Sequence, residues 1–215
     1  MGVVLLAMTI GGFIIAAGLL AVSYFARLNW LKTFVLGGIA VWLTGYVILL
    51  FVGSFFSEEK TLGMNEPKEF CGFYLDCHLR TAVTDVRKTK TYGNVVAEGE
   101  FYVVKVKVLS DAKQATLNLT DPRFHVYDAT GRSYNPVENP MIPPPSFDDK
   151  VPAGGSFEKE VVFDLPKDVN NPRLDIREGF GVDRVVELIL IGDEDSILHK
   201  RNYFRLNPGE QVASK

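Results

Sequence analysis

The residues best suited to chemistry are the two cysteines, Cys71 and Cys77, and the histidine that follows them, His78. Five residues separate the cysteines, whereas haem attachment requires two, and a Cys–Cys–His zinc site would need a fourth ligand or an open position. The other histidines, His125 and His199, are isolated in the sequence. In an oxidising compartment two lone cysteines pair with each other. We therefore rank a Cys71–Cys77 disulfide ahead of a metal site, and a metal site ahead of haem.

An acidic turn formed by Asp193, Glu194 and Asp195 is the second candidate, with Asp148 and Asp149 as further carboxylates. Calcium takes six to eight oxygen ligands, and an EF-hand places its aspartates at alternate positions with a glycine at position six. That spacing is absent here. We interpret the turn as solvated and leave ion binding open.

Motifs of catalysis are otherwise missing from the sequence. It contains no nucleophile elbow, no phosphate-binding loop and no paired metal motif. We therefore expect a protein that is not an enzyme and that carries no metal or other cofactor.

Two long apolar segments organise the rest of the chain. Residues 3–25 and 33–52 contain no charged side chain, and only residues 26–32 separate them. As helices they would extend about 34 and about 30 Å, enough to cross the hydrocarbon core of a bilayer. A cleaved signal peptide would begin with basic residues and have a shorter apolar run. Residues 1–52 are therefore predicted to form a transmembrane helical hairpin in contact with membrane lipid.

Two basic residues predict the orientation of this hairpin. Arg27 and Lys32 lie in the connecting loop without an acidic neighbour, and neither outer flank is clearly basic. Short loops that carry Lys and Arg remain on the cytoplasmic side. We therefore expect a cytoplasmic loop, with both termini and the C-terminal domain outside the cytoplasm.

Small residues in both segments are candidate positions for helix packing. They are Gly11, Gly12, Ala16, Gly37, Gly38 and Gly45. Such residues, spaced four apart, let helix backbones approach closely in a membrane. We favour packing of the two segments against each other, with docking on helices of another protein as the alternative. Neither segment contains Asp, Glu, Lys, Arg or His, which argues against a proton path, an ion path or His-ligated haem within them.

The chain changes character near residue 53. All 26 acidic residues follow this point with 21 of the 23 basic ones, because two basic residues precede it, so the remainder has a formal charge of −5. This acidic surface gives no electrostatic footprint for nucleic acid. We assign residues 53–78 to a linker with the Cys71/Cys77 loop, residues 79–206 to one domain and residues 207–215 to a polar tail.

Strand patterns fill the domain. Val104, Val106 and Val108 alternate with Lys105 and Lys107, which is typical of a strand with one buried face. We expect strands at residues 79–87, 101–109, 115–119, 123–128, 133–134, 157–165, 174–177, 185–191 and 198–206. Short strands joined by turns, without a strong amphipathic helix, predict an all-β sandwich.

Residues 136–152 form a proline-rich stretch within the domain. Its candidate contact residues are Pro136, Pro140, Pro143, Pro144, Pro145 and Phe147. Proline-rich segments are extended and poor in hydrogen bonds, and a stiff, exposed segment loses little entropy on binding. A stiff surface connection and a docking arm for a partner are equally good interpretations.

Four segments of the domain resemble the extracytoplasmic immunoglobulin-like domains of the DUF4352 type, which are related to telokin-like secreted bacterial antigens. They are the strand 101–109, the hairpin 124–134 with its aspartate, glycine and tyrosine, the proline-x-glycine turn at 152–154, and the strand 161–166 that ends in Phe-Asp-Leu-Pro. The resemblance implies an immunoglobulin-like sandwich on the outer face of a bacterial inner (plasma) membrane, with a binding or structural role. This family usually has a single signal or lipid anchor, so the two-segment hairpin departs from it and favours a membrane-embedded role.

Two hypotheses for function follow. In the first, the chain is a non-enzymatic accessory or scaffolding subunit that packs on other integral membrane subunits of a larger complex, such as a respiratory, photosynthetic or transport assembly. In the second, it is a free-standing envelope protein that binds or senses a ligand. The sequence does not identify the partner complex, and any small-molecule ligand is unknown.

Overall fold

A computed structural model describes residues 2–71, 77–179, 181–193 and 195–207 of the chain. These residues form two compact units, one made of Met1–Glu58 with Glu187–Lys200 and the other of Glu59–Val186 with Arg201–Lys215.

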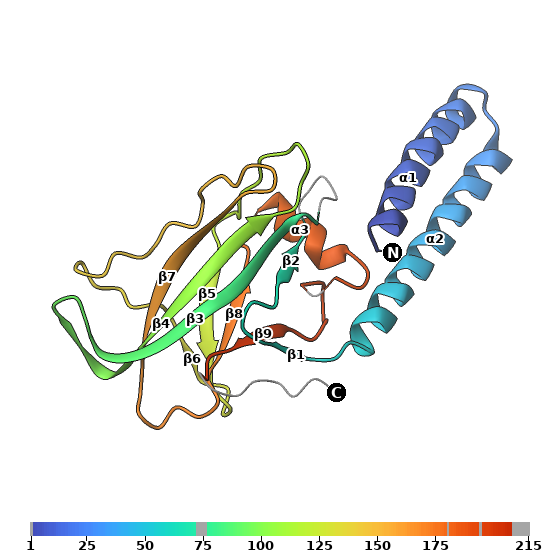
Figure 1. Ribbon diagram of the computed structural model, residues 1–215. Coiled ribbons are helices and arrows are strands. Elements are labelled where there is room, and N and C mark those ends of the chain that lie inside the picture. The colour runs from blue at the N-terminus through green and yellow to red at the C-terminus, as the bar shows by residue number, and fades with distance from the viewer. Residues whose placement is uncertain (1, 72–76, 180, 194, 208–215) are drawn as a thin grey trace. The chain divides into compact units, whose positions relative to one another are not determined.

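The first unit contains two long helices, α1 (Gly2–Phe25) and α2 (Asn29–Phe55), joined by a tight turn (Figure 1). Both helices are long and apolar enough to cross a membrane, and only 11% and 17% of their most apolar stretches are buried. Core helices of soluble proteins are mostly covered, so this exposure fits membrane anchoring. The turn is shorter than expected, because α2 begins at Asn29 and already includes Lys32.

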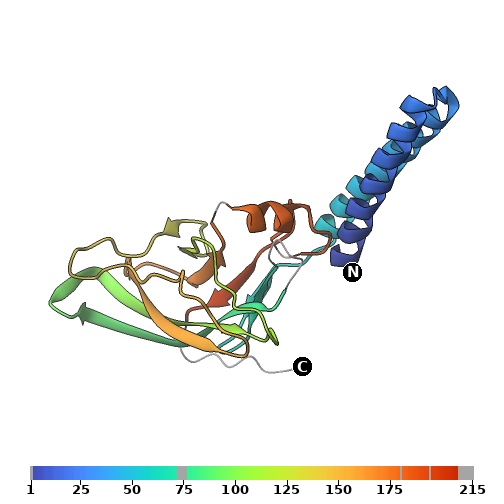
Figure 2. The same ribbon diagram turned by 90° about the horizontal axis from the view of Figure 1, so that it is seen from above.

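The second unit is a β-sandwich of two sheets (Figures 1 and 2). One sheet has the order β1-β9-β8-β5-β6 and the other β2-β3-β4-β7. The strands are β1 (Lys60–Leu62), β2 (Lys68–Phe70), β3 (Leu79–Tyr92), β4 (Val95–Ser110), β5 (Arg123–Tyr127), β6 (Ser133–Tyr134), β7 (Ser156–Leu165), β8 (Arg173–Arg177) and β9 (Asn202–Arg205). All neighbouring strands are antiparallel except β1 and β9, which run parallel. The predicted immunoglobulin-like sandwich is confirmed.

The core between the sheets follows the alternation that the sequence predicts. Val104, Val106 and Val108 of β4 are fully buried, and they belong to the same apolar cluster as Ile176 of β8 and Phe204 of β9. Each fully buried aliphatic side chain contributes about 1.5–3 kcal/mol, so this shared cluster is the main force that holds the sheets together.

The predicted linker and one predicted strand need correction. β1 and β2 both lie within residues 53–78, and each pairs with a strand of a different sheet, so the sandwich begins before residue 79. Residues 185–191 are largely helical, because α3 covers Val182–Ile189. Its sequence Val-Val-Glu-Leu-Ile contains β-branched residues typical of strands, yet its apolar positions also fit a helical period.

Two further strands are shorter than expected. Residues 115–119 contribute only an isolated bridge from Leu117 to Val151. The last strand covers Asn202–Arg205 instead of residues 198–206. Leu198 has a φ of 62°, a left-handed conformation that interrupts an extended chain.

Candidate functional site

The two long helices are joined by a polar contact among apolar side chains. The indole Nε1–H of Trp42 on α2 donates a hydrogen bond of 3.0 Å to Thr9 Oγ1 on α1. The Thr9 hydroxyl in turn donates to the Leu5 carbonyl at 2.8 Å, so its hydrogen-bonding capacity is well used. In hydrocarbon such a bond fixes the register of two helices, since no water competes for the groups.

Two apolar hollows flank this contact. One has a volume of about 610 Å³ and is lined by Gly37, Gly38 and Gly45 together with larger residues of α2. The other has a volume of about 460 Å³ and is lined by Gly12, Ala16 and Gly38 among residues of both helices. Five of the six candidate packing residues thus line a hollow, and Gly11 lies outside both.

The glycines are not required by the contact between α1 and α2. A Cβ atom built at Gly11, Gly12, Gly37, Gly38 or Gly45 would meet nothing within 4 Å outside its own helix. The structure therefore does not bring these positions into close helix–helix contact within the hairpin, which was the interpretation that the sequence favoured.

A segment far away in the sequence is bound to the end of α2. The Tyr46 hydroxyl donates to the Ile189 carbonyl at 2.8 Å, and the Ser54 hydroxyl donates to the Ile197 carbonyl at 2.6 Å. The Lys200 amide donates to Ser57 Oγ at 2.8 Å. Residues 187–200 are thereby fixed to the hairpin within one unit.

Glycine has a definite purpose at the start of α1. A Cβ atom at Gly2 would lie 2.1 Å from the Ile191 carbonyl oxygen, so only glycine fits there. This contact between residues 187–200 and the hairpin was not predicted from the sequence. Tyr46 and Ser54 are two of several hydroxyl side chains in the helices, so no sequence signal distinguishes them.

The acidic turn within residues 187–200 is stabilised by a hydrogen bond between a side chain and the backbone of the turn itself. Asp193 Oδ1 accepts a hydrogen bond of 2.9 Å from the Asp195 amide, and Asp195 is buried. Glu194 lies outside the described residues. Asp148 accepts from the Asp121 amide, and Asp149 forms an ion pair with Lys159, so these two carboxylates have other roles. Among the described residues no group of three or more His, Cys, Asp and Glu side chains could hold a metal ion.

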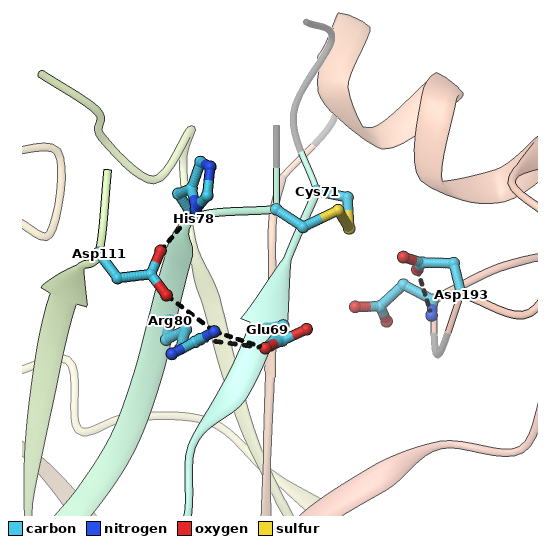
Figure 3. Close-up of a disulfide and its surroundings, with 8 residues drawn as sticks. Glu69, Cys71, His78, Arg80, Asp111 and Asp193 are labelled. Carbon is cyan, nitrogen blue, oxygen red and sulfur yellow. Dashed lines mark hydrogen bonds and ion pairs between the residues drawn. A yellow bond between two sulfur atoms is a disulfide. The ribbon is translucent and has the colours of Figure 1, made fainter. Parts of the chain in front are cut away.

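The predicted disulfide between Cys71 and Cys77 is confirmed (Figure 3). Because both sulfurs are bonded to each other, neither is available as a thiolate ligand for zinc or as an attachment point for haem. The bond closes a loop with a sequence separation of six residues, so it constrains only local structure.

A chain of polar and ionisable side chains lies beside the disulfide (Figure 3). His78 Nδ1 is 2.6 Å from Asp111 Oδ1, and Arg80 bonds both Asp111 Oδ2 at 2.8 Å and Glu69 Oε1 at 2.9 Å. These residues tie β2, β3 and the end of β4 together. All four side chains are partly exposed to water, so the ion pairs stabilise the domain only slightly.

The proline-rich stretch is not a free arm. Phe147 is only 2% exposed, and its ring lies 4.7 Å from that of Phe124 and 6.2 Å from that of Phe157. Ile142 and Val151 are buried as well. The docking interpretation is therefore wrong for Phe147, which is a core residue. Pro140, Pro143 and Pro144 are exposed, whereas Pro136 and Pro145 are partly buried.

One carboxylate organises the hairpin between β5 and β6. Asp128 is 1% exposed and accepts hydrogen bonds from the Thr130 amide and hydroxyl and from the Arg132 amide and Nε. These bonds, led by that from the Thr130 hydroxyl, hold the pKa of Asp128 well below its usual range. The same pairing raises the pKa of Arg132. The donors come from residues 130 and 132, so these bonds hold the turn after β5 in shape.

Comparison with solved structures gives distant likenesses. The secreted protein MPT63 of Mycobacterium tuberculosis is 13% identical, with a TM-score of 0.42 over 57% of this chain and 98% of its own. An uncharacterized β-sandwich protein of Clostridium difficile is 11% identical, with a TM-score of 0.38 over 70% and 97%. A putative lipoprotein of Bacillus subtilis, ycdA, is 15% identical, with a TM-score of 0.33 over 58% and 35%. Likenesses at these scores carry no argument about function.

Comparison with family patterns is more specific. A search of curated proteins gives no significant match. The pattern described as a domain of unknown function, DUF4352, matches residues 76–185, just over half of the 215 residues. This match covers β3 to β8, which include the strand, hairpin and turn segments that carried the resemblance in the sequence. The protein therefore belongs to the DUF4352 family, with two long apolar helices before its β-sandwich domain.

Proposed function

We propose that this protein is a non-enzymatic accessory subunit of a membrane complex. The hairpin crosses the membrane twice and receives helices of another integral membrane protein in its two hollows. The DUF4352 sandwich lies on the extracytoplasmic side. The observation that carries the proposal is the set of glycines at which a Cβ atom would meet nothing within the chain, although they line apolar hollows.

Membrane physics explains why such hollows favour a protein partner. Lipid tails are as apolar as Leu, so helices associate through close packing and hydrogen bonds, without a hydrophobic driving force. Glycine costs helix stability relative to alanine, about 1 kcal/mol in water. Gly37, Gly38 and Gly45 carry this cost without any contact inside the hairpin that needs it. A second helix that packs into the hollow supplies the compensating contacts.

The chemistry of the hairpin supports a packing role over transport. Neither helix contains Asp, Glu, Lys, Arg or His between Val3 and Phe25 or between Thr33 and Val52. Ion and proton paths need such groups or a water-filled cavity. The described part of the sandwich likewise favours binding over catalysis. Its most extensively hydrogen-bonded carboxylate, Asp128, already accepts bonds from the backbone and from the Arg132 side chain.

Extraction of the full-length protein in mild detergent, followed by affinity purification, tests the proposal. We expect a discrete complex with a second integral membrane protein in fixed proportion. Replacing Gly12 and Gly38 by Leu would fill the smaller hollow and reduce the recovered partner by about tenfold, because the backbones would be forced apart. Gly18→Leu is the matched control, since Gly18 is also open but lines neither hollow.

Two results would contradict the proposal. One is a wild-type protein that migrates as a monomer with lipid alone. The other is equal loss of partner in Gly18→Leu and in the double variant, which would indicate a general effect of bulk in the helix.

A further inference from the structure

One surface of the sandwich collects arginines from three strands. In β8, Leu174 and Ile176 point into the core, so Arg173, Asp175 and Arg177 face outward. By the same alternation Arg123 of β5 and Arg205 of β9 lie on this outer side, because Phe124 and Phe204 are core residues. We call the outer side of this sheet the arginine face: Arg123, Arg173, Arg177, Arg201 and Arg205 around Asp175.

The register places arginines directly opposite each other. Arg123 pairs with Arg177 across β5 and β8, and Arg173 pairs with Arg205 across β8 and β9. Like charges at directly opposed positions of a sheet are destabilising. This domain lies in the part of the chain with more acidic than basic residues, so a general basic character does not explain the cluster. Acidic side chains offset part of this repulsion, because Arg123 lies 3.6 Å from Asp121 and Arg177 is ion-paired with Asp175.

A single buried aspartate holds the centre of the arginine face. Asp175 is 1% exposed, and its Oδ2 accepts from Arg177 Nε at 2.7 Å and Arg177 Nη2 at 2.5 Å. Arg201 Nη1 lies 3.7 Å from the same oxygen. Asp175 Oδ1 has no hydrogen-bond partner among the described residues. Asp175 thus positions two guanidinium groups while one of its own oxygens still needs a donor.

Aromatic rings and a second unsatisfied atom complete the surface. The Arg173 guanidinium lies 4.6 Å from the centre of the Tyr203 ring, and that ring makes an edge contact with Tyr127 at 5.9 Å. Arg173 is ion-paired with Glu59, yet its buried Nε has no hydrogen-bond partner within the described part of the chain. The arginine face therefore offers an unused donor and an unused acceptor next to fixed positive charge.

We propose that the arginine face binds a hydroxylated anion, a polyol phosphate. Its phosphate oxygens accept from the guanidinium groups, which bind phosphate in a planar, two-pronged manner. Its hydroxyl groups supply the donor that Asp175 Oδ1 lacks. The same chemistry occurs in the headgroup of phosphatidylglycerol and in soluble glycerol-phosphate polymers. The site does not depend on what the hairpin binds.

Binding is measured with the full-length protein in phosphatidylcholine nanodiscs. In one arm, short poly(glycerol phosphate) is titrated by calorimetry. In the other, nanodiscs that contain phosphatidylglycerol are compared with phosphatidylcholine alone by hydrogen exchange at residues 173–177 and 201–205. We expect saturable binding or protection in at least one arm, and weaker binding at higher salt because the interaction is ionic. The arm that responds identifies the source of the ligand.

Arg123→Gln with Arg201→Gln tests the site itself. The double variant removes charge-assisted hydrogen bonds to the phosphate, so it should bind about tenfold more weakly or worse. Arg123→Gln alone removes one opposed arginine pair and an exposed ion pair with Asp121 that contributes little, so the melting temperature should change little. A loss of affinity without loss of stability separates binding from a structural role.

Arg87→Gln is the matched control, because Arg87 lies on β3 of the other sheet and pairs with Glu160. It should bind like the wild type. The proposal is overturned if neither arm shows binding, or if Arg87→Gln weakens binding as much as the double variant does.

Discussion

At the scale of single residues, Asp128 shows how a family motif becomes structure. The aspartate, glycine and tyrosine of the hairpin are Asp128, Gly131 and Tyr134. Gly131 has a φ of 84°, which only glycine adopts readily. The turn therefore brings Thr130 and Arg132 onto the Asp128 carboxylate. This family motif contains no catalytic pattern. It specifies a turn that the buried Asp128 carboxylate stabilises.

Asp128→Asn should lower stability at neutral pH and remove a pH dependence. The pKa of Asp128 is lowered in the folded protein. Its stabilisation is therefore present above the unfolded pKa, about 4, and is lost as the pH falls below that value. Thermal unfolding of the full-length protein in detergent, followed by circular dichroism, should show a melting temperature several degrees lower for the variant at pH 7. The difference between the two proteins should start to narrow below about pH 4 and should keep narrowing as the pH falls toward the lowered pKa of the folded protein.

Asp168→Asn is the control for this experiment. Asp168 pairs with the same arginine, Arg132, but its side chain is 69% exposed. An exposed pair contributes little. Equal destabilisation by both substitutions would show that the Asp128 bonds are not the cause.

At the scale of elements, the strands that could be predicted are those whose own residues alternate between apolar and polar side chains. From Val104 to Ser110, β4 alternates between buried and partly buried side chains, and its buried face is the predicted one. β1 and β2 are only three residues each, and their pairing partners, β9 and β3, decide their conformation. Short segments of this kind lack a period that could reveal them. The arginine face was missed for a related reason, since its residues meet only when β5, β8 and β9 pair.

The proline-rich stretch gives an element-scale test. Composition indicated a stiff, exposed segment, either a surface connection or a docking arm, but composition does not report the one aromatic residue that packs into the core. Phe147→Ala should destabilise the sandwich by about 3 kcal/mol, because it leaves a cavity beside Phe124 and Phe157. Pro144→Ala, at an exposed position of the same stretch, should change stability little. Urea unfolding of both full-length variants measures the difference. Near-equal values would mean that the Phe147 ring is not buried in solution.

At the scale of the whole molecule, the chain combines two units with opposite surfaces. The hairpin exposes apolar side chains over most of its length, and the sandwich encloses a conventional core. Sequence composition was enough to distinguish the apolar hairpin from the sandwich domain, with the change near residue 53. It could not show that residues 187–200 belong with the hairpin, because that contact depends on hydrogen bonds to Tyr46, Ser54 and Ser57.

The orientation of the hairpin is the last prediction, and it concerns the whole chain. Arg27 and Lys32 near the turn should keep that turn in the cytoplasm. A C-terminal reporter that is active only in the cytoplasm should therefore stay silent, and a periplasmic reporter should be active. Replacing both residues by Glu should produce a mixture of orientations, since two charges set the bias, whereas Lys200→Glu, outside the turn, should not. The disulfide offers an independent readout, because Cys71 and Cys77 pair stably in an oxidising compartment. Free thiols in native membranes together with an active cytoplasmic reporter would reverse the predicted orientation.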